Sequence, residues 1–327
     1  MIKKAFILFV CLGLSLLVQA QQDAQYSQYM FNGIYINPAY AGYKEQLNIH
    51  SFYRNQWTGI DGSPKSMSLA VDAIANNRNV GLAFQVAADQ LGAESSMSAY
   101  ANYAYRLRVG SSEASRLSFG LGFGVMQQRL DASKMNARDA DDDAILKVGS
   151  QSVVVPDARA GIYYSDDRFY AGFSADNLVA QHIINKKNLN VYFPTPKTHY
   201  YLTAGMLIPI NEDIQLKPSF LLKDDRGGPT SLDLNAFMLL ANKVWIGAGY
   251  RTAVKLYSKS YLQNDLQQNN SVVGMVEFMA TEYIRIGYAY DQSMGKLAGY
   301  SGGSHEISVG VVIRPSQVVR MLTPRYF

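Results

Sequence analysis

The sequence predicts an all-β protein, a transmembrane antiparallel β-barrel of about 14 strands, from three observations. The first is alternation with a period of two, as in "NVGLAFQVAAD" at residues 79–89, where Val80, Leu82, Phe84 and Val86 alternate with small or polar residues. The second is that the face opposite such apolar residues is rich in glycine and charge. The third is that short and long connections alternate along the chain, as they do in outer-membrane barrels.

The first 20 residues have the pattern of a secretory signal peptide. Two lysines precede an apolar run at 5–18, and small residues favour cleavage after Ala20. The one cysteine, Cys11, lies inside that run, so the mature chain is expected to have no disulfide and no thiolate metal site.

The segment 21–46 is polar and aromatic and shows no clear alternation. We expect it either inside the barrel as a plug or in the periplasm as a docking segment. A disordered leader is the alternative, but its large aromatic and apolar residues argue against that. Those residues are Tyr26, Tyr29, Met30, Phe31, Tyr35 and Tyr40.

The barrel itself is expected over residues 47–314. Alternation predicts strands at 47–57, 65–74, 79–89, 96–109, 116–129, 153–165, 168–176, 198–210, 213–223, 230–241, 243–252, 270–280, 282–291 and 303–314. Most of these segments have the length that a tilted strand needs to cross a bilayer. An even number of strands returns both ends to the periplasm, which makes 315–327 a periplasmic C-terminal tail.

The two faces of these strands differ in a way that indicates lipid on one side and a wet or plugged lumen on the other. The apolar face includes Leu121 and Phe123, and the opposite face includes Gly120 and Gly122. The candidate lumen charge network consists of Arg54, Asp72, Arg106, Asp157, Arg159, Asp233, Arg251, Glu277, Arg285 and Glu306. A secreted β-sandwich or propeller is the alternative, but it would have to expose a lightly charged, glycine-rich face along strand after strand.

The longer connections, at 130–152, 177–197, 253–269 and 292–302, are expected on the extracellular side. One of them has apolar residues that a solvated loop does not need. The candidate partner-binding residues there are Ile183, Ile184, Leu189, Tyr192 and Phe193. The alternative role of this loop is a lid over the barrel mouth.

No catalytic, cofactor-binding or metal-binding residues are expected. "GYSGG" around Ser301 fits a nucleophile motif in form, but it leads into a strand instead of a helix. The acidic run at 139–143 lacks the spacing of a calcium loop. With 30 basic and 26 acidic residues, the chain has no charge pattern of a nucleic-acid-binding protein.

Several ordered motifs resemble the PorP/SprF family of outer-membrane proteins, which are linked to the type IX secretion system of Bacteroidetes. They are "QQDAQYSQYMFNGIYINPAYAG", "PDARAGIYYSDDRFYAGFSADNL", "HYYLTAG", "LKPSFLLKDDRGGPTSLDLNAF", "WIGAGYR", "IRIGYAYD", "GSHEISVG" and the terminal "PRYF". The resemblance implies a barrel similar in architecture to fatty acid transporter barrels. It also implies roles in protein secretion, gliding motility and adhesin anchoring.

The expected function is that of a non-enzymatic outer-membrane component that supports secretion and surface anchoring of an exported protein such as a large adhesin. Outer-membrane lipid is expected around the barrel. The resemblance implies two kinds of protein partner, the C-terminal domain of an exported surface protein and periplasmic peptidoglycan-associated or secretion-system proteins. The alternatives are a channel or transporter for a small hydrophobic or nutrient molecule, and a structural barrel that only recruits periplasmic partners.

Overall fold

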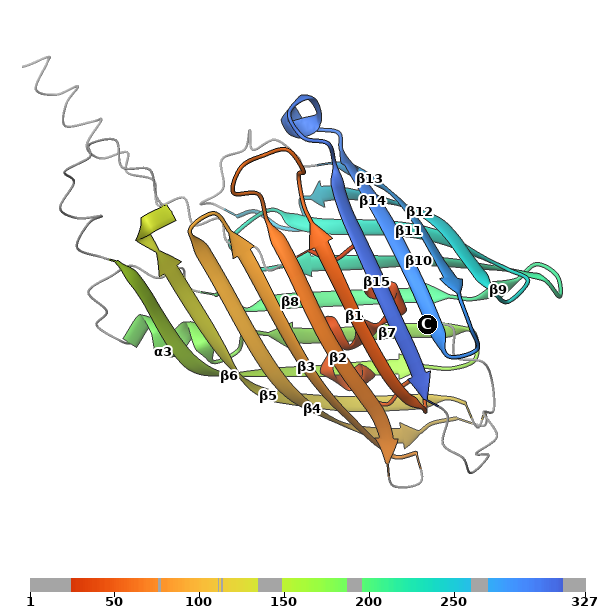
Figure 1. Cartoon of the computed structure of the whole chain (residues 1–327). Coiled ribbons are helices and arrows are strands. Elements are labelled where there is room, and N and C mark those ends of the chain that lie inside the picture. Colours follow the sequence, from red (N-terminus) through yellow and green to blue (C-terminus); the bar gives the residue numbers. More distant parts are fainter. Residues whose placement is uncertain are drawn as a thin grey trace, which may run out of the picture.

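The strands of this computed structural model form one closed antiparallel sheet (Figure 1). The strands pair in sequence order, with β8 and β9 both beside β10, and the barrel closes because β1 pairs with β15. The structure describes residues 25–75, 78–110, 112, 114–134, 149–186, 196–259 and 270–313. The expected signal peptide and C-terminal tail lie outside these residues.

The described strands are β1 (Leu47–Asn55), β2 (Lys65–Ala75), β3 (Val80–Leu91), β4 (Glu94–Arg108), β5 (Arg116–Asp131), β6 (Ser150–Ser165), β7 (Phe169–Asp176), β8 (His199–Met206), β9 (Ile208–Pro209), β10 (Ile214–Asp224), β11 (Thr230–Leu240), β12 (Val244–Val254), β13 (Ser271–Met279), β14 (Ile284–Ser293) and β15 (Ser304–Ile313). The helical elements are α3 (Ala180–Lys186) and the 3-10 turns η1 (Tyr29–Phe31), η2 (Gly33–Tyr35), η3 (Pro38–Tyr40), η4 (Ala132–Lys134) and η5 (Lys296–Gly299). No described helix is long and apolar enough to span a membrane.

The prediction of about 14 strands is confirmed, although one strand is broken. β8 and β9 both pair with β10 and are separated only at Leu207. Pro218 lies in this part of β10 and has no N–H to donate to a neighbouring strand. The two segments therefore occupy the place of the single strand predicted at 198–210.

Two hairpins at the end of the barrel with the longer connections extend further than predicted. Leu91 still pairs with Glu94, because Gly92 takes a positive φ of 56° and allows a tight two-residue turn. In the next hairpin, Asp131 pairs with Ser150. The alternation signal underestimated these strands because polar residues replace apolar ones toward their ends.

The outward face carries the predicted apolar band. Phe123 is 65% exposed and Leu121 is 51% exposed, whereas the neighbouring Gly120 and Gly122 are buried. Leu82 and Phe84 of the alternating segment at 79–89 also point outward. The predicted register is therefore correct in these strands, and the apolar band is of the kind that faces acyl chains.

Residues 25–46, called the plug below, lie inside the barrel, where η1, η2 and η3 appear as short red to orange coils between the walls (Figure 1). Ile34 and Ala41 are fully buried, and Tyr40 is 2% exposed. The plug and the inward-facing side chains of the wall form one core, which is the main apolar cluster of the molecule's described part.

Candidate functional site

The plug runs through the lumen from one end of the barrel to the other. Its first residues contact Glu306, which lies on β15 beside the longer connection that contains η5. Its last residues contact Arg106, which lies on β4 beside the short connection to β5. Since long connections are extracellular in such barrels, the plug begins on the extracellular side and ends on the periplasmic side.

A buried carboxylate holds the extracellular end of the plug. The two oxygens of Glu306 accept hydrogen bonds from the backbone N–H groups of Ser27 and Gln28, each at 2.8 Å. Arg54 donates to the Ser27 hydroxyl at 2.7 Å and pairs with Glu306 at 3.3 Å. Hydrogen bonds that involve charged groups are stronger than neutral ones, so this end is firmly anchored.

Ion pairs extend from this anchor along the barrel wall. Asp291 lies between two arginines, 3.1 Å from Arg54 and 2.7 Å from Arg251. Arg251 also donates to both oxygens of Asp233. Each of these charges is buried and has an opposite charge beside it, which offsets the cost of removing it from water.

The middle of the plug is held through its backbone and one amide side chain. Arg159 donates to the carbonyl oxygen of Tyr35 at 3.1 Å and pairs with Asp176 at 2.8 Å. The Asn37 side chain donates to the carbonyl oxygen of Ile162 on β6 at 3.0 Å, and its oxygen caps η3. These bonds fix the position of the plug backbone relative to the barrel wall.

A second charged group lies at the periplasmic end. Arg106 donates to the carbonyl oxygen of Gly42 at 2.8 Å and pairs with Glu45 at 3.3 Å. Three other predicted members, Asp72, Glu277 and Arg285, form a separate group around Asn48. The Asn48 side chain donates to Asp72 at 2.8 Å, and Arg285 donates to Asn48 at 3.1 Å and to Glu277 at 3.4 Å.

All ten residues of the candidate lumen charge network are buried, but they divide into separate groups. Arg54, Asp233, Arg251 and Glu306 join through Asp291, whereas Arg106 contacts the plug, and Asp72 lies near Glu277 and Arg285 across Asn48. Asp291 and Asp176 were missed, although both occupy inward positions of predicted strands. Glu45 was missed because it lies in a segment without alternation.

Asp157 has a different role from the other candidates. Its carboxylate accepts the N–H groups of Val179 and Ala180 at the start of α3, each at 2.9 Å, and the Tyr100 hydroxyl at 2.7 Å. It therefore fixes α3 to the inner wall of β6.

The candidate partner-binding loop is only partly described. Ile184 on α3 is 5% exposed and packs in an apolar cluster with Met126 and Val155, with Ile183 partly buried beside it. Leu189, Tyr192 and Phe193 lie outside the described residues. In this structure the Ile184 side chain is used to pack α3 onto the barrel.

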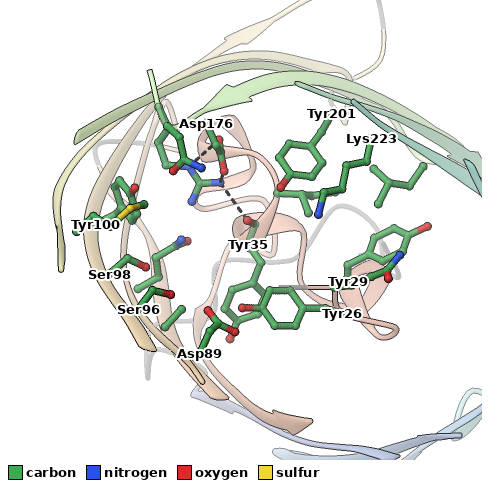
Figure 2. A pocket seen from close by; sticks show the side chains of 18 of the residues that line it. Tyr26, Tyr29, Tyr35, Asp89, Ser96, Ser98, Tyr100, Asp176, Tyr201 and Lys223 are labelled. Carbon is green, nitrogen blue, oxygen red and sulfur yellow. Dashed lines mark hydrogen bonds and ion pairs between the residues drawn. The ribbon is translucent and has the colours of Figure 1, made fainter. Parts of the chain in front are cut away.

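A cavity of about 120 Å³, called the chamber below, lies above the plug on the side of the longer connections. Figure 2 shows Tyr26, Tyr29 and Tyr35 of the plug beside it, Ser96, Ser98 and Tyr100 on one wall, and Tyr201 and Lys223 on another. Within the described residues, no group of three or more His, Cys, Asp or Glu side chains has the arrangement of a metal site.

Comparison with known families gives one informative match. The model described as "Type IX secretion system membrane protein PorP/SprF" matches residues 18–311. A search of curated proteins gave no match.

Several solved structures are similar to this chain at low sequence identity. The CymD monoaromatic hydrocarbon channel is 12% identical with a TM-score of 0.50, over 87% of this chain and 93% of that one. A Pseudomonas aeruginosa FadL homologue is 9% identical with a TM-score of 0.46, over 92% and 95%. The Acinetobacter baumannii outer membrane protein Omp33 is 7% identical with a TM-score of 0.46, over 83% and 100%. The closed barrel, its apolar outer band and the family match together place the protein in the outer membrane.

Proposed function

This chain belongs to the PorP/SprF family of type IX secretion system membrane proteins, and from that premise we propose that it supports secretion and cell-surface anchoring of an exported protein, such as a large adhesin, by binding it. The partners in this proposal are the C-terminal domain of the exported protein and periplasmic peptidoglycan-associated or secretion-system proteins. The barrel acts as a binding module and performs no chemistry.

The observation that carries this proposal is the way the plug is seated. Backbone groups of the plug are held by Glu306 near one end, Arg159 in the middle and Arg106 near the other end. The plug and the wall share one buried core. A lumen that is filled and fixed in this way supports a barrel that holds a partner more than one that conducts solutes.

The candidate loop can be tested without disturbing the packing of α3. Replacing 187–195 with a Gly/Ser linker of equal length keeps Ala180 and Ile184, which pack against the wall. We expect this change to lower surface display of the co-expressed exported protein, measured by surface labelling. As the matched control, replacing the exposed turn 211–213 at the opposite end should leave display unchanged. Heat-modifiable migration on gels reports that both barrels are folded.

The second candidate function is a channel or transporter for a small hydrophobic or nutrient molecule. The chamber favours it, because a cavity above the plug is where a solute would enter. The relation to the CymD hydrocarbon channel supports only a shared fold at 12% identity. Planar-bilayer recordings separate the two candidates: an anchor should remain closed, whereas conductance through the unaltered barrel would favour transport. If the barrel only recruits periplasmic partners, replacing 187–195 on the extracellular side should leave surface display of the exported protein unchanged.

A further inference from the structure

The chamber lies on the extracellular side of the plug, which forms its floor. Its floor includes Gln25, Tyr26 and Tyr29 of the plug. Its walls include Asp89 and Ser96, which lie near the β3–β4 turn on the extracellular side. The chamber and an exported protein at the cell surface therefore lie on the same side of the plug.

Two of the acidic side chains that line the chamber have arginine partners. Arg159 pairs with Asp176 at 2.8 Å, and Asp233 pairs with Arg251 at 3.0 Å. Asp89 and Lys223 also line the cavity and carry opposite charges, and the rest of its lining is mainly tyrosine rings, hydroxyl groups and side-chain amides. Such a surface recognises a ligand by ring packing and hydrogen bonds more than by net charge.

One side chain indicates that the chamber is built for a ligand that donates a hydrogen bond. Gln85 on β3 lines the chamber and is only 6% exposed, yet its Oε1 atom has no hydrogen-bond partner in the structure. A buried acceptor without a partner is unfavourable, because it has lost its hydrogen bonds to water. A ligand N–H or O–H group would satisfy this oxygen once the Gln85 side chain turns toward the cavity.

We propose that the chamber receives a short polypeptide segment of the exported protein, in which peptide or side-chain N–H groups reach Gln85 and apolar atoms pack on the tyrosines. This inference rests on the proposed function. The cavity, at about 120 Å³, is smaller than the roughly 300–1,000 Å³ of typical small-molecule pockets. It fits a few side chains of a larger partner better than a whole solute. Tyrosine, serine and amide side chains are also the groups that protein-binding loops use most.

Neighbouring residues on β4 provide a matched pair for testing this proposal. Ser98 lines the chamber and pairs with Ala87 and Met126, which line it too. Ala99 points to the other face, beside Val125, which is 50% exposed. Ser98→Trp fills the chamber, whereas Ala99→Trp adds an aromatic ring on the lipid side, where such rings are well tolerated near the membrane surface.

We expect Ser98→Trp to lower surface display of the co-expressed exported protein at least about fivefold, the effect of losing roughly 1 kcal/mol of binding. Ala99→Trp should leave display unchanged, and both variants should keep heat-modifiable migration. If Ser98→Trp displays the exported protein normally, the chamber is not its docking site and the proposal is overturned.

A labelling experiment on a folded barrel complements the bulky variant. The sequence contains one cysteine, Cys11, so the unaltered protein serves as the background control. Ser98→Cys should react with a membrane-impermeant maleimide in cells that lack the exported protein and become protected several-fold when it is co-expressed. Tyr300→Cys, at a residue 80% exposed in an extracellular connection, should stay reactive in both.

The outcomes separate this inference from the proposed function. Equal labelling of Ser98→Cys with and without a displayed exported protein overturns the chamber as a docking site and leaves the anchoring function in place. Display that persists when the whole barrel gene is deleted overturns the proposed function and the docking site with it. Protection by a small solute in cells that lack the exported protein would instead assign the chamber to transport.

Discussion

Gly120 is the position where the fit between plug and wall can be tested most directly. A Cβ atom there would lie 2.5 Å from the carbonyl carbon of Pro38, and closer still to the backbone N and Cα of Ala39. Ordinary contact begins at 3.4 Å, so the plug backbone would have to move by at least about 0.9 Å to relieve the Pro38 contact, and further to relieve those to Ala39. Backbone held by hydrogen bonds on both sides cannot move that far without loss, because Asn37 and Arg159 fix the neighbouring residues.

We expect Gly120→Ala to weaken seating of the plug by about 1–3 kcal/mol, the usual cost of overpacking a tight core. Even 2 kcal/mol corresponds to a factor of about 30 in the seated population. The assays are limited proteolysis within residues 25–46 and planar-bilayer conductance, with heat-modifiable migration to confirm an intact barrel. Gly274→Ala is the matched control, since a Cβ there has nothing within 4 Å.

Deleting residues 25–43 tests whether the cost of Gly120→Ala arises from its clash with the plug. If the cost arises from the plug, Gly120→Ala should have little effect on the thermal midpoint of the plugless barrel, and the two changes should be strongly non-additive. Equal behaviour of Gly120→Ala and Gly274→Ala in the full chain would refute the reasoning, because it would mean that the plug is not tightly seated against β5.

Three further predictions follow from particular contacts. Glu306→Gln should loosen the extracellular end of the plug by about 1.5–3 kcal/mol, since it weakens charge-assisted bonds to Ser27, Gln28 and Arg54; faster hydrogen exchange of the plug amides checks it, with exposed Glu212→Gln as the control. Asp157→Ala should free α3 at a cost of about 0.5–2 kcal/mol, because two helix N–H groups lose their acceptor; proteolysis at 177–186 with an unchanged barrel is the expected readout, and a resistant α3 would contradict it. Leu121→Arg should reduce membrane insertion by about 2–4 kcal/mol, because the side chain is 51% exposed on the lipid face; the heat-modifiable fraction measures this, and Leu121→Met should insert normally.

The barrel could be predicted from the sequence because alternation is a local property. Leu121, Gly122 and Phe123 show opposite faces within three residues, so the register of β5 follows without knowledge of any other strand. The ends of strands were less predictable, because polar residues such as Gln151 and Ser152 replace apolar ones where β6 extends beyond the predicted 153–165. The break between β8 and β9 could not be predicted from alternation within 198–210, because it depends on the pairing with β10.

The site was only partly predictable, since it depends on which distant residues meet in the lumen. The inward direction of Arg54 and Glu306 follows from alternation, but their shared contact with Ser27 spans most of the sequence. The chamber was not predicted at all. Its lining combines Gln85, Ser98 and Tyr201 from separate strands with plug residues that have no periodic pattern. No local signal connects such positions.

The contacts between plug and wall suggest why the two should be regarded as one folding unit. Glu306 binds two backbone N–H groups, and Arg106 and Lys217 bind backbone carbonyl oxygens of Gly42 and Met30. If the plug left, a carboxylate and two buried cations would each lose a partner within a narrow lumen, so water would have to enter in its place. Most of these hydrogen bonds are made to backbone groups of the plug. Many plug side chains can therefore change while the plug keeps its position in the lumen. In the proposed docking of the exported protein, the extracellular end of the plug, which forms the chamber floor, is where such changes would alter partner choice at the least cost to the barrel.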